Sequence, residues 1–243
     1  SLTNESPDLK TNFPISKFPN SKIPPLPLNK AAYHQLKDEL EQKGVTLVAV
    51  SKTRSIEDIL GLYDLGQRDF GENYVQEMAE KAARLPNDIR WHFIGHLQTN
   101  KVKLIVPFVQ LIHGVDSLKL LQEINKQAGK AGRVVDCLLQ VHIAQEETKF
   151  GLDEKELDEL LNNSIAGLLN VRICGLMGMA SFTDEKDTVR KEFQNLKEIF
   201  ERLQTNDSRL TTLSMGMSAD YKLAMEEGSN MVRIGSLLFG ERE

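Results

Sequence analysis

The chain has little of several features that mark specialised classes of protein. It contains only two cysteines, Cys137 and Cys174, and so small a number excludes a disulfide framework. No apolar run approaches the roughly 18 residues that a membrane-spanning helix needs. The first residues also lack the short apolar core of a secretory signal. We therefore expect a protein without a membrane partner, located in the cytoplasm.

Positive charge is not in excess either. The sequence has 30 Lys and Arg against 35 Asp and Glu, which gives a net charge of −5. Proteins that bind nucleic acids usually carry a clustered basic face, so a nucleic-acid partner is not expected. The glycine-rich GxGxxG turn of dinucleotide-binding sheets is missing after the first apolar run, where the sequence reads SKTRS. No large apolar surface stripe is evident, and we expect a monomer.

Composition divides the chain into two parts. Residues 1–28 hold six of the eight prolines and no glycine. Proline fixes φ and removes a backbone donor, so this part is predicted to be an extended or disordered tail. Residues 29–243 have the regular patterns of a folded domain, and the chain length is close to the roughly 250 residues typical of one (β/α)8 barrel.

Apolar runs and amphipathic segments alternate through residues 29–243. The runs predicted as buried parallel strands are 46–52, 68–73, 90–96, 111–116, 134–143, 171–180, 211–217 and 231–240. The predicted helices are 29–43, 55–66, 74–85, 101–106, 117–130, 153–163, 189–204 and 220–227. This alternation predicts an α/β fold, a single (β/α)8 TIM barrel. A doubly wound open sheet is the alternative, but it usually has fewer strands. The helix at 29–43 is expected to take the place of a last helix after the eighth strand.

Candidate functional residues follow the predicted strands, because barrel active sites lie at the carboxyl ends of the strands. Lys52 ends the first apolar run, where low-dielectric walls would disfavour its ammonium form and free the amine for imine chemistry. A lysine that simply reaches solvent is the alternative. The segments SMGMS (214–218) and RIGS (233–236) follow the seventh and eighth strands, the recurrent phosphate site of this fold. Gly216 and Gly235 would let the backbone approach an anion, although each could equally be a turn or packing glycine.

Arg233 lies within the last apolar run, between Val232 and Ile234. An arginine inside a barrel is costly unless it is paired, and a salt bridge on the outer face is the alternative. Together with an imine-forming Lys52, the phosphate segments predict a phosphorylated aldehyde held at both ends. A guanidinium facing a pyridine nitrogen of that ligand would keep the nitrogen unprotonated and weaken the ring as an electron sink.

Seven segments resemble the pyridoxal phosphate homeostasis proteins, the YggS/PROSC type. They are AVSKTR (49–54), FGENYVQE (70–77), WHFIGHLQTNK (91–101), TKFG (148–151), GLMGM (175–179), LSMGMSAD (213–220) and MVRIGSLLFG (231–240). The resemblance implies the barrel of the alanine racemase N-terminal domain, which is PLP fold type III. It also implies pyridoxal 5′-phosphate (PLP) bound as a Schiff base on Lys52, with Asn73 beside the ring. By the same resemblance Arg233 would face the pyridine nitrogen, and the phosphate would be held by Ser214, Gly216, Gly235 and Ser236.

The resemblance implies a role in intracellular PLP (vitamin B6) homeostasis without an amino-acid reaction of its own, with apo PLP-dependent enzymes as further partners. A PLP-dependent racemase is the alternative, and it needs an acid or base on each face of the substrate carbon. In racemases the second base is a tyrosine from an additional domain; here only Tyr74 and Tyr221 are expected near the site. A binding protein that has lost its cofactor is disfavoured because Lys52 and both phosphate segments are present. Lys149 in TKFG is either a solvated loop lysine or a transient acceptor of PLP.

Overall fold

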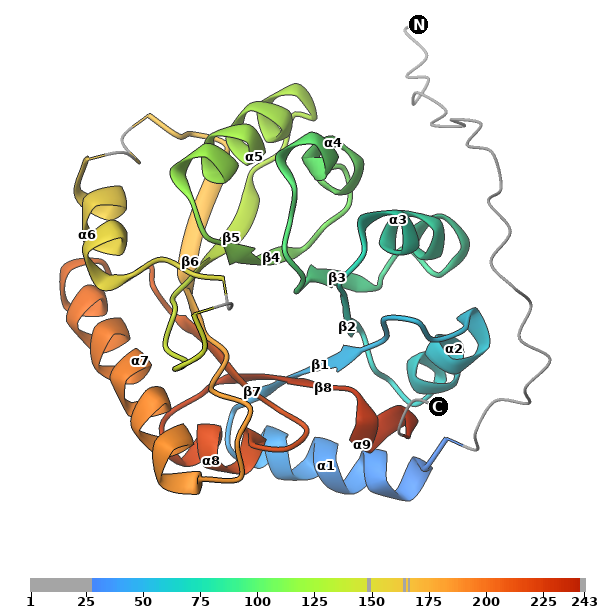
Figure 1. The fold of residues 1–243 in the computed structure, drawn as a ribbon. Coiled ribbons are helices and arrows are strands. Elements are labelled where there is room, and N and C mark those ends of the chain that lie inside the picture. Colours follow the sequence, from blue (N-terminus) through green and yellow to red (C-terminus); the bar gives the residue numbers. More distant parts are fainter. Residues whose placement is uncertain (1–27, 148–149, 164, 166, 241–243) are drawn as a thin grey trace, which may run out of the picture.

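The structure, a computed structural model, describes residues 28–147, 150–163, 165 and 167–240. Eight parallel strands follow one another in chain order and close into a barrel, and helices surround it (Figure 1). The predicted (β/α)8 barrel is therefore confirmed. Lys149 and all of the predicted tail except residue 28 lie outside the described residues.

Each predicted strand is present and is shorter than its apolar run. The strands are β1 (Thr46–Val50), β2 (Asp69–Glu72), β3 (Arg90–Phe93), β4 (Leu111–Val115), β5 (Val135–Gln140), β6 (Val171–Met177), β7 (Thr212–Met217) and β8 (Met231–Ile234). The helices are α1 (Lys30–Gln42), α2 (Ile56–Asp64), α3 (Val75–Arg84), the 3-10 turn η1 (Thr99–Lys101), α4 (Val102–Ile105), α5 (Leu118–Lys130), α6 (Glu154–Asn163), α7 (Lys186–Asn206), α8 (Tyr221–Glu226) and α9 (Ser236–Phe239).

The last predicted strand is wrong in its second half. A strand was predicted over 231–240, but β8 ends at Ile234 and the next residues form α9. At Gly235 the backbone leaves the extended region, and its carbonyl accepts hydrogen bonds from the N–H groups of Leu238 and Phe239. A short apolar run such as SLLF has the same pattern in a buried helix and in a buried strand, so periodicity alone did not separate the two.

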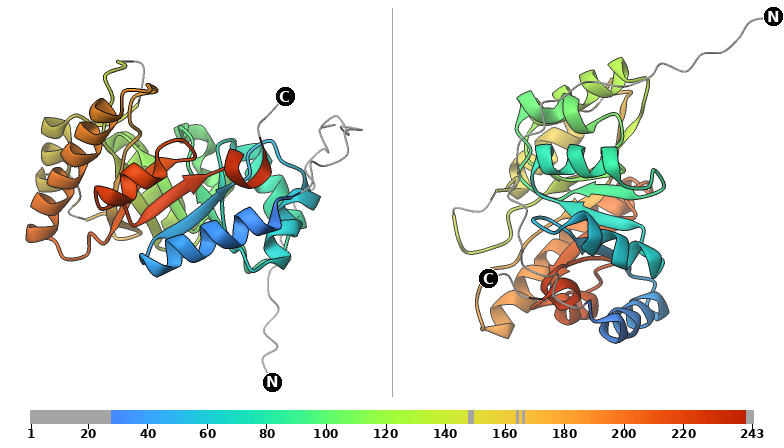
Figure 2. Two further views of the ribbon diagram at one scale, coloured as in Figure 1. Left: turned by 90° about the horizontal axis from the view of Figure 1, so that it is seen from below. Right: turned by 90° about the vertical axis from the view of Figure 1, so that its right-hand side faces the viewer.

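Helix α1 completes the ring of helices, as expected. It begins after Asn29, whose side chain accepts a hydrogen bond from the N–H of Ala32. It lies beside β8 and β1, between α8 and α9 (Figure 1), and along the outside of the barrel (Figure 2). Its buried side chains include Leu36 and Leu40, and each such leucine contributes about 1.5–3 kcal/mol when buried.

Two apolar clusters support the barrel. The larger one fills the space between the strands and the helices. The smaller one lies inside the barrel and consists of Val48, Leu111, Leu138, Met177 and Met231. The buried polar residues of the strands include His92, His113, Ser214 and Arg233. Among the described residues, no helix combines the length and apolar character needed to span a membrane.

Candidate functional site

Four of the seven predicted site residues lie on one arc of the barrel rim. Strands β7, β8, β1 and β2 are consecutive neighbours in the closed barrel. Lys52 follows the carboxyl end of β1, Asn73 follows β2, and Gly235 and Ser236 follow β8. Parallel strands end at the same rim, so these four residues lie on the same side of the barrel.

The backbone beside Lys52 is strained. Thr53 has φ of 62°, the one positive φ of a non-glycine residue in the described part of the chain. Such a conformation costs about 1 kcal/mol or more for an L-residue, so other contacts must hold it. The N–H of Thr53 donates to Glu77 Oε1 at 2.5 Å, and its hydroxyl donates to the carbonyl of Lys52 at 2.6 Å.

A buried ion cluster anchors the residues on either side of Lys52. The Lys81 ammonium, on α3, donates to Glu72 Oε1, Glu77 Oε1 and the Ser51 carbonyl, each at 2.7 Å. The Ser51 hydroxyl donates to the same Glu72 oxygen at 2.6 Å. Since Glu77 also accepts from the backbone of the residue after Lys52, the cluster fixes the lysine from both sides. Sequence reasoning missed this cluster, although a glutamate at the end of the apolar run DFGE was an available signal.

Glu72 is the cluster member most affected by burial. Its side chain is fully buried, and Oε2 has no hydrogen-bond partner among the described residues. Burial raises the pKa of Glu72 to about 7, against the opposing effect of the Lys81 ammonium. The carboxyl therefore titrates near neutral pH, directly below the backbone that carries the candidate lysine.

The raised pKa of Glu72 predicts a specific pH dependence of stability. An unfolded glutamate titrates near 4.5, so between pH 4.5 and 7 the folded state binds more protons than the unfolded state. The free energy of unfolding should fall as the pH rises through this window, by about 3 kcal/mol for the full shift. Urea denaturation at pH 5 and pH 7.5 should show this fall in the wild type and a smaller one in Glu72→Gln. Equal pH differences in the two proteins would contradict the assignment.

Asn73 presents an unpaired acceptor at the rim. Its Oδ1 is buried and has no hydrogen-bond partner among the described residues. Gly95, at the end of β3, lies against the backbone of Asn73: a Cβ at position 95 would be 2.4 Å from the Asn73 carbonyl oxygen. Buried polar atoms are normally paired, so the Asn73 oxygen is suited to a ligand donor.

The residues after β7 and β8 form the candidate phosphate end. The N–H of Gly235 donates to the hydroxyl of Ser218 at 3.2 Å, and Ser236 is exposed at the start of α9. Ser218 was missing from the predicted set, although it is the second serine of the same SMGMS motif. Gly216 is buried with φ of 100°, and a Cβ there would lie 2.6 Å from Ala224 Cβ, so packing of β7 against α8 requires this glycine.

Arg233 points into the barrel rather than to the outer face. It is only 3% exposed, and it donates to Ser214 Oγ at 2.5 Å and to the Gly178 carbonyl at 3.2 Å. Burial lowers the pKa of Arg233 to about 10, which leaves the guanidinium charged at neutral pH. Ser214 is fully buried, and its hydroxyl also lies 3.0 Å from His113 Nδ1. Both hydrogen bonds of Ser214 are thus made inside the barrel.

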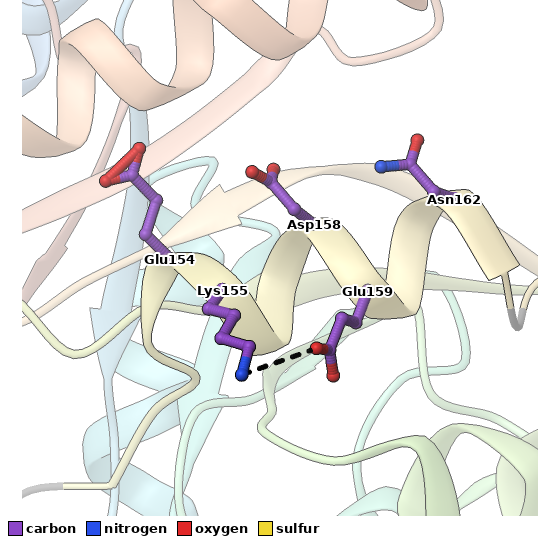
Figure 3. Close-up of a pocket in the computed structure, with 5 residues that line it drawn as sticks. All are labelled: Glu154, Lys155, Asp158, Glu159 and Asn162. Carbon is purple, nitrogen blue, oxygen red and sulfur yellow. Dashed lines mark ion pairs between the residues drawn. The ribbon is translucent and has the colours of Figure 1, made fainter.

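A hollow on the surface of α6 has a different character. It is shallow, measures about 380 Å³ and is lined by residues of α6 alone, with Lys155 and Glu159 paired at 3.9 Å (Figure 3). It is a charged helix surface, and we assign no function to it. No cluster of His, Cys, Asp and Glu suited to a metal ion occurs within the part of the chain that the structure describes.

Comparison with known proteins agrees with this geometry. The family model of the alanine racemase N-terminal domain matches residues 30–243. A pyridoxal phosphate homeostasis protein of Aquifex aeolicus is 44% identical over 199 residues, which are 81% of this chain and 87% of the relative. The chain belongs to the pyridoxal phosphate homeostasis protein family. Another member, from Escherichia coli, is 38% identical over 206 residues, covering 82% of this chain and 86% of the relative. The family predicted from the seven motifs is confirmed.

Solved structures show the same barrel. PipY of Synechococcus elongatus, in a structure with PLP bound, is 37% identical with a TM-score of 0.79, covering 86% of this chain and 99% of PipY. An alanine racemase of Clostridium difficile is 16% identical with a TM-score of 0.72, covering 88% of this chain and 58% of the racemase. The second similarity establishes a shared fold and nothing more.

Proposed function

We propose that this protein binds PLP at the β7–β8–β1–β2 arc and acts in PLP homeostasis. The observation that carries the proposal is the position of Lys52 at the carboxyl end of β1, on the same arc as the Gly235 and Ser218 pair. The family relationship supports it, because relatives are named for PLP homeostasis and PipY has been solved with PLP bound.

The described residues fit the parts of this cofactor. When bound, PLP supplies an electrophilic aldehyde carbon on a phosphorylated pyridine ring. The Lys52 amine would condense with the aldehyde, with loss of one water, and hold the cofactor as a Schiff base. The unpaired Asn73 oxygen would lie beside the ring. Gly235, Ser236 and Ser218 would hold the phosphate, Gly216 would shape the turn that carries Ser218, and Arg233 would face the pyridine nitrogen.

We infer a non-catalytic carrier rather than a racemase. A charged Arg233 at the pyridine nitrogen would keep that nitrogen unprotonated, which weakens electron withdrawal by the ring. The contacts of the two candidate tyrosines give no support for a second base at Lys52. Tyr221 is buried and donates its hydroxyl to Glu39 on α1, outside the barrel, and Tyr74 is 57% exposed. As a cytoplasmic monomer, such a carrier would release PLP to apo-enzymes through the partly exposed Lys52.

The proposal predicts a covalent cofactor on one lysine. Purified protein mixed with PLP should develop a visible absorption band, and borohydride should fix the cofactor on Lys52, as located by peptide mass spectrometry. Lys52→Ala should lose the band and the fixed adduct, whereas Lys101→Ala, at the 3-10 turn η1, should keep both. Full labelling of the Lys52→Ala protein would refute the assignment. With L- or D-alanine the loaded protein should produce no enantiomer, and measurable racemisation would favour the alternative function.

A further inference from the structure

A chain of hydrogen bonds runs through the barrel interior from its floor to Arg233. Asp69 Oδ1 lies 2.9 Å from His92 Nε2, and His92 Nδ1 lies 2.9 Å from His113 Nε2. His113 Nδ1 lies 3.0 Å from Ser214 Oγ, which accepts from Arg233 at 2.5 Å. The five residues come from β2, β3, β4, β7 and β8.

The lower end of this chain opens onto the amino-terminal face of the barrel. Asp69 is the first residue of β2, and it lines a cavity of about 560 Å³ together with Arg90 and His92. The same cavity is lined by the first residues of several other strands, including Thr46, Leu111, Thr212 and Met231. The chain of hydrogen bonds therefore joins the amino-terminal face of the barrel, opposite the candidate PLP site, to the Arg233 guanidinium at that site.

Arg233 is held by hydrogen bonds rather than by an ion pair, although the negative charge of Asp220 opposes the lowering of its pKa by burial. No ion pair joins it to a carboxylate in the described part of the protein, and its two hydrogen bonds go to neutral oxygens. A buried charge is costly unless it is paired or hydrogen-bonded. The negative end to which the hydrogen bonds lead is Asp69. Burial raises the pKa of Asp69, but hydrogen bonds from Arg90 and His92 outweigh this effect and lower the pKa to about 2.

The chemistry of the end groups gives these bonds a direction. Arginine can only donate, and an ionised carboxylate can only accept. With both rings neutral, Ser214 donates to His113 Nδ1, His113 Nε2–H donates to His92 Nδ1, and His92 Nε2–H donates to Asp69. Every group is then satisfied. In the opposite direction His113 would donate to Ser214, whose own proton would lack an acceptor among the described residues.

Burial keeps the ring at the centre of the hydrogen-bond chain neutral. His113 is fully buried, and this burial, with the nearby His92 and Arg233, lowers its pKa well below the ordinary value. A neutral ring has one donor nitrogen and one acceptor nitrogen. In the direction that satisfies every group, the hydroxyl of Ser214 donates its proton to His113 Nδ1 and turns an oxygen lone pair toward Arg233.

We propose that Asp69, His92 and His113 are positioning residues that hold Arg233 through Ser214, so that a carboxylate at the barrel floor sets PLP affinity at the rim. The effect on PLP affinity rests on the proposed function, whereas the direction of the hydrogen bonds does not. The histidine side chains can be observed in the ligand-free protein, so the two parts can fail separately.

The floor of the barrel supplies a matched control for Asp69. Asp136, the second residue of β5, lines the same cavity and accepts two hydrogen bonds from Arg172, at 2.8 and 2.7 Å. Asp69 accepts the same fork from Arg90, at 2.8 and 2.5 Å. The two carboxylates are similarly buried, with exposed side-chain fractions of 13% and 18%. They differ in that Asp69 also accepts from His92.

The first test is the nitrogen NMR spectrum of ¹⁵N-histidine-labelled, ligand-free wild type. His92 and His113 should both carry their proton on Nε2, with Nδ1 unprotonated. In Asp69→Asn the side chain offers a donor as well as an acceptor to His92, so the single direction is lost and both tautomers should be populated, whereas Asp136→Asn should keep the wild-type spectrum. A wild-type His113 with its proton on Nδ1 would overturn the proposal without any variant.

The second test is PLP affinity, measured by equilibrium dialysis. Asp69→Asn and Ser214→Ala should each raise the Kd about fivefold to tenfold, as expected for the disruption of one hydrogen bond of ordinary strength. Asp136→Asn should stay within about twofold of the wild type. Equal affinities of Asp69→Asn and Asp136→Asn would overturn the proposal. If the wild type itself fails to bind PLP, the proposed function fails, while the histidine spectrum still decides the direction of the hydrogen bonds.

Discussion

Replacing Lys81 by methionine should lower the free energy of unfolding by about 3–5 kcal/mol. The substitution keeps much of the apolar stem but leaves two carboxylates, Glu72 and Glu77, without their shared ammonium. It also removes the donor that holds the Ser51 carbonyl. The loss can be measured by urea denaturation at pH 7.5, which is close to the pKa of about 7 to which burial raises Glu72.

A surface lysine provides the comparison. Lys155 pairs with Glu159 at the same four-residue spacing, but its side chain is 84% exposed (Figure 3). Exposed ion pairs contribute between about 0 and 1 kcal/mol, so Lys155→Met should change stability little. Adding Glu72→Gln to Lys81→Met should restore part of the loss, since it removes one buried carboxylate. Similar losses for Lys81→Met and Lys155→Met would show that the cluster does not stabilise the loop around Lys52.

Gly95→Ala should lower the free energy of unfolding by about 3 kcal/mol, the upper end of the usual range for overpacking. A Cβ at this position would lie 2.4 Å from the Asn73 carbonyl oxygen and 2.8 Å from its Cα. Both are backbone atoms, so rotation of a side chain cannot relieve the clash. The resulting backbone shift should also displace the side-chain Oδ1 of Asn73 and weaken PLP binding. Thermal denaturation and PLP titration of the variant test both effects.

Gly61→Ala is the matched control for this clash. Gly61 lies within α2, and a Cβ there would meet a leucine methyl of residue 28 at 3.4 Å, an ordinary contact. Alanine is preferred over glycine inside a helix by about 0.5–1 kcal/mol, so this variant should be neutral or slightly more stable. If both variants melt alike, the close approach of β3 to Asn73 is not a constraint on the fold.

The barrel and the position of Lys52 could be predicted because both depend on local patterns. Apolar runs that end in polar residues mark the strands and their carboxyl ends without knowledge of which strands are neighbours. The chain of hydrogen bonds from Asp69 to Arg233 could not be predicted in this way. His92 and His113 stand in the apolar runs RWHF and LIHGV, where a polar residue signals a buried contact but does not name its partner. Only the closed barrel brings them to Ser214, on β7.

The two serines near the candidate phosphate end differ in their position relative to β7. The two serines of SMGMS are four positions apart and have the same strand parity, so only the end of the strand between them separates their environments. Ser214 is inside the strand and buried, whereas Ser218 lies just beyond its end and contacts the Gly235 N–H. A hydroxyl that follows a strand is the better candidate for a rim ligand than one within it, because the strand interior belongs to the barrel core.

The place of α1 in the ring has a consequence for how the molecule assembles. The Tyr221 hydroxyl meets Glu39 across 182 positions of chain, and Arg54 reaches the Gly240 carbonyl across 186. On a ribosome, α1 and β1 emerge long before β8 and α9, the elements against which they pack. Their apolar faces therefore stay uncovered until those elements are made. Closing the ring then costs the loop-closure entropy of nearly the whole barrel in one step. Co-translational folding should therefore delay barrel closure until β8 and α9 have emerged.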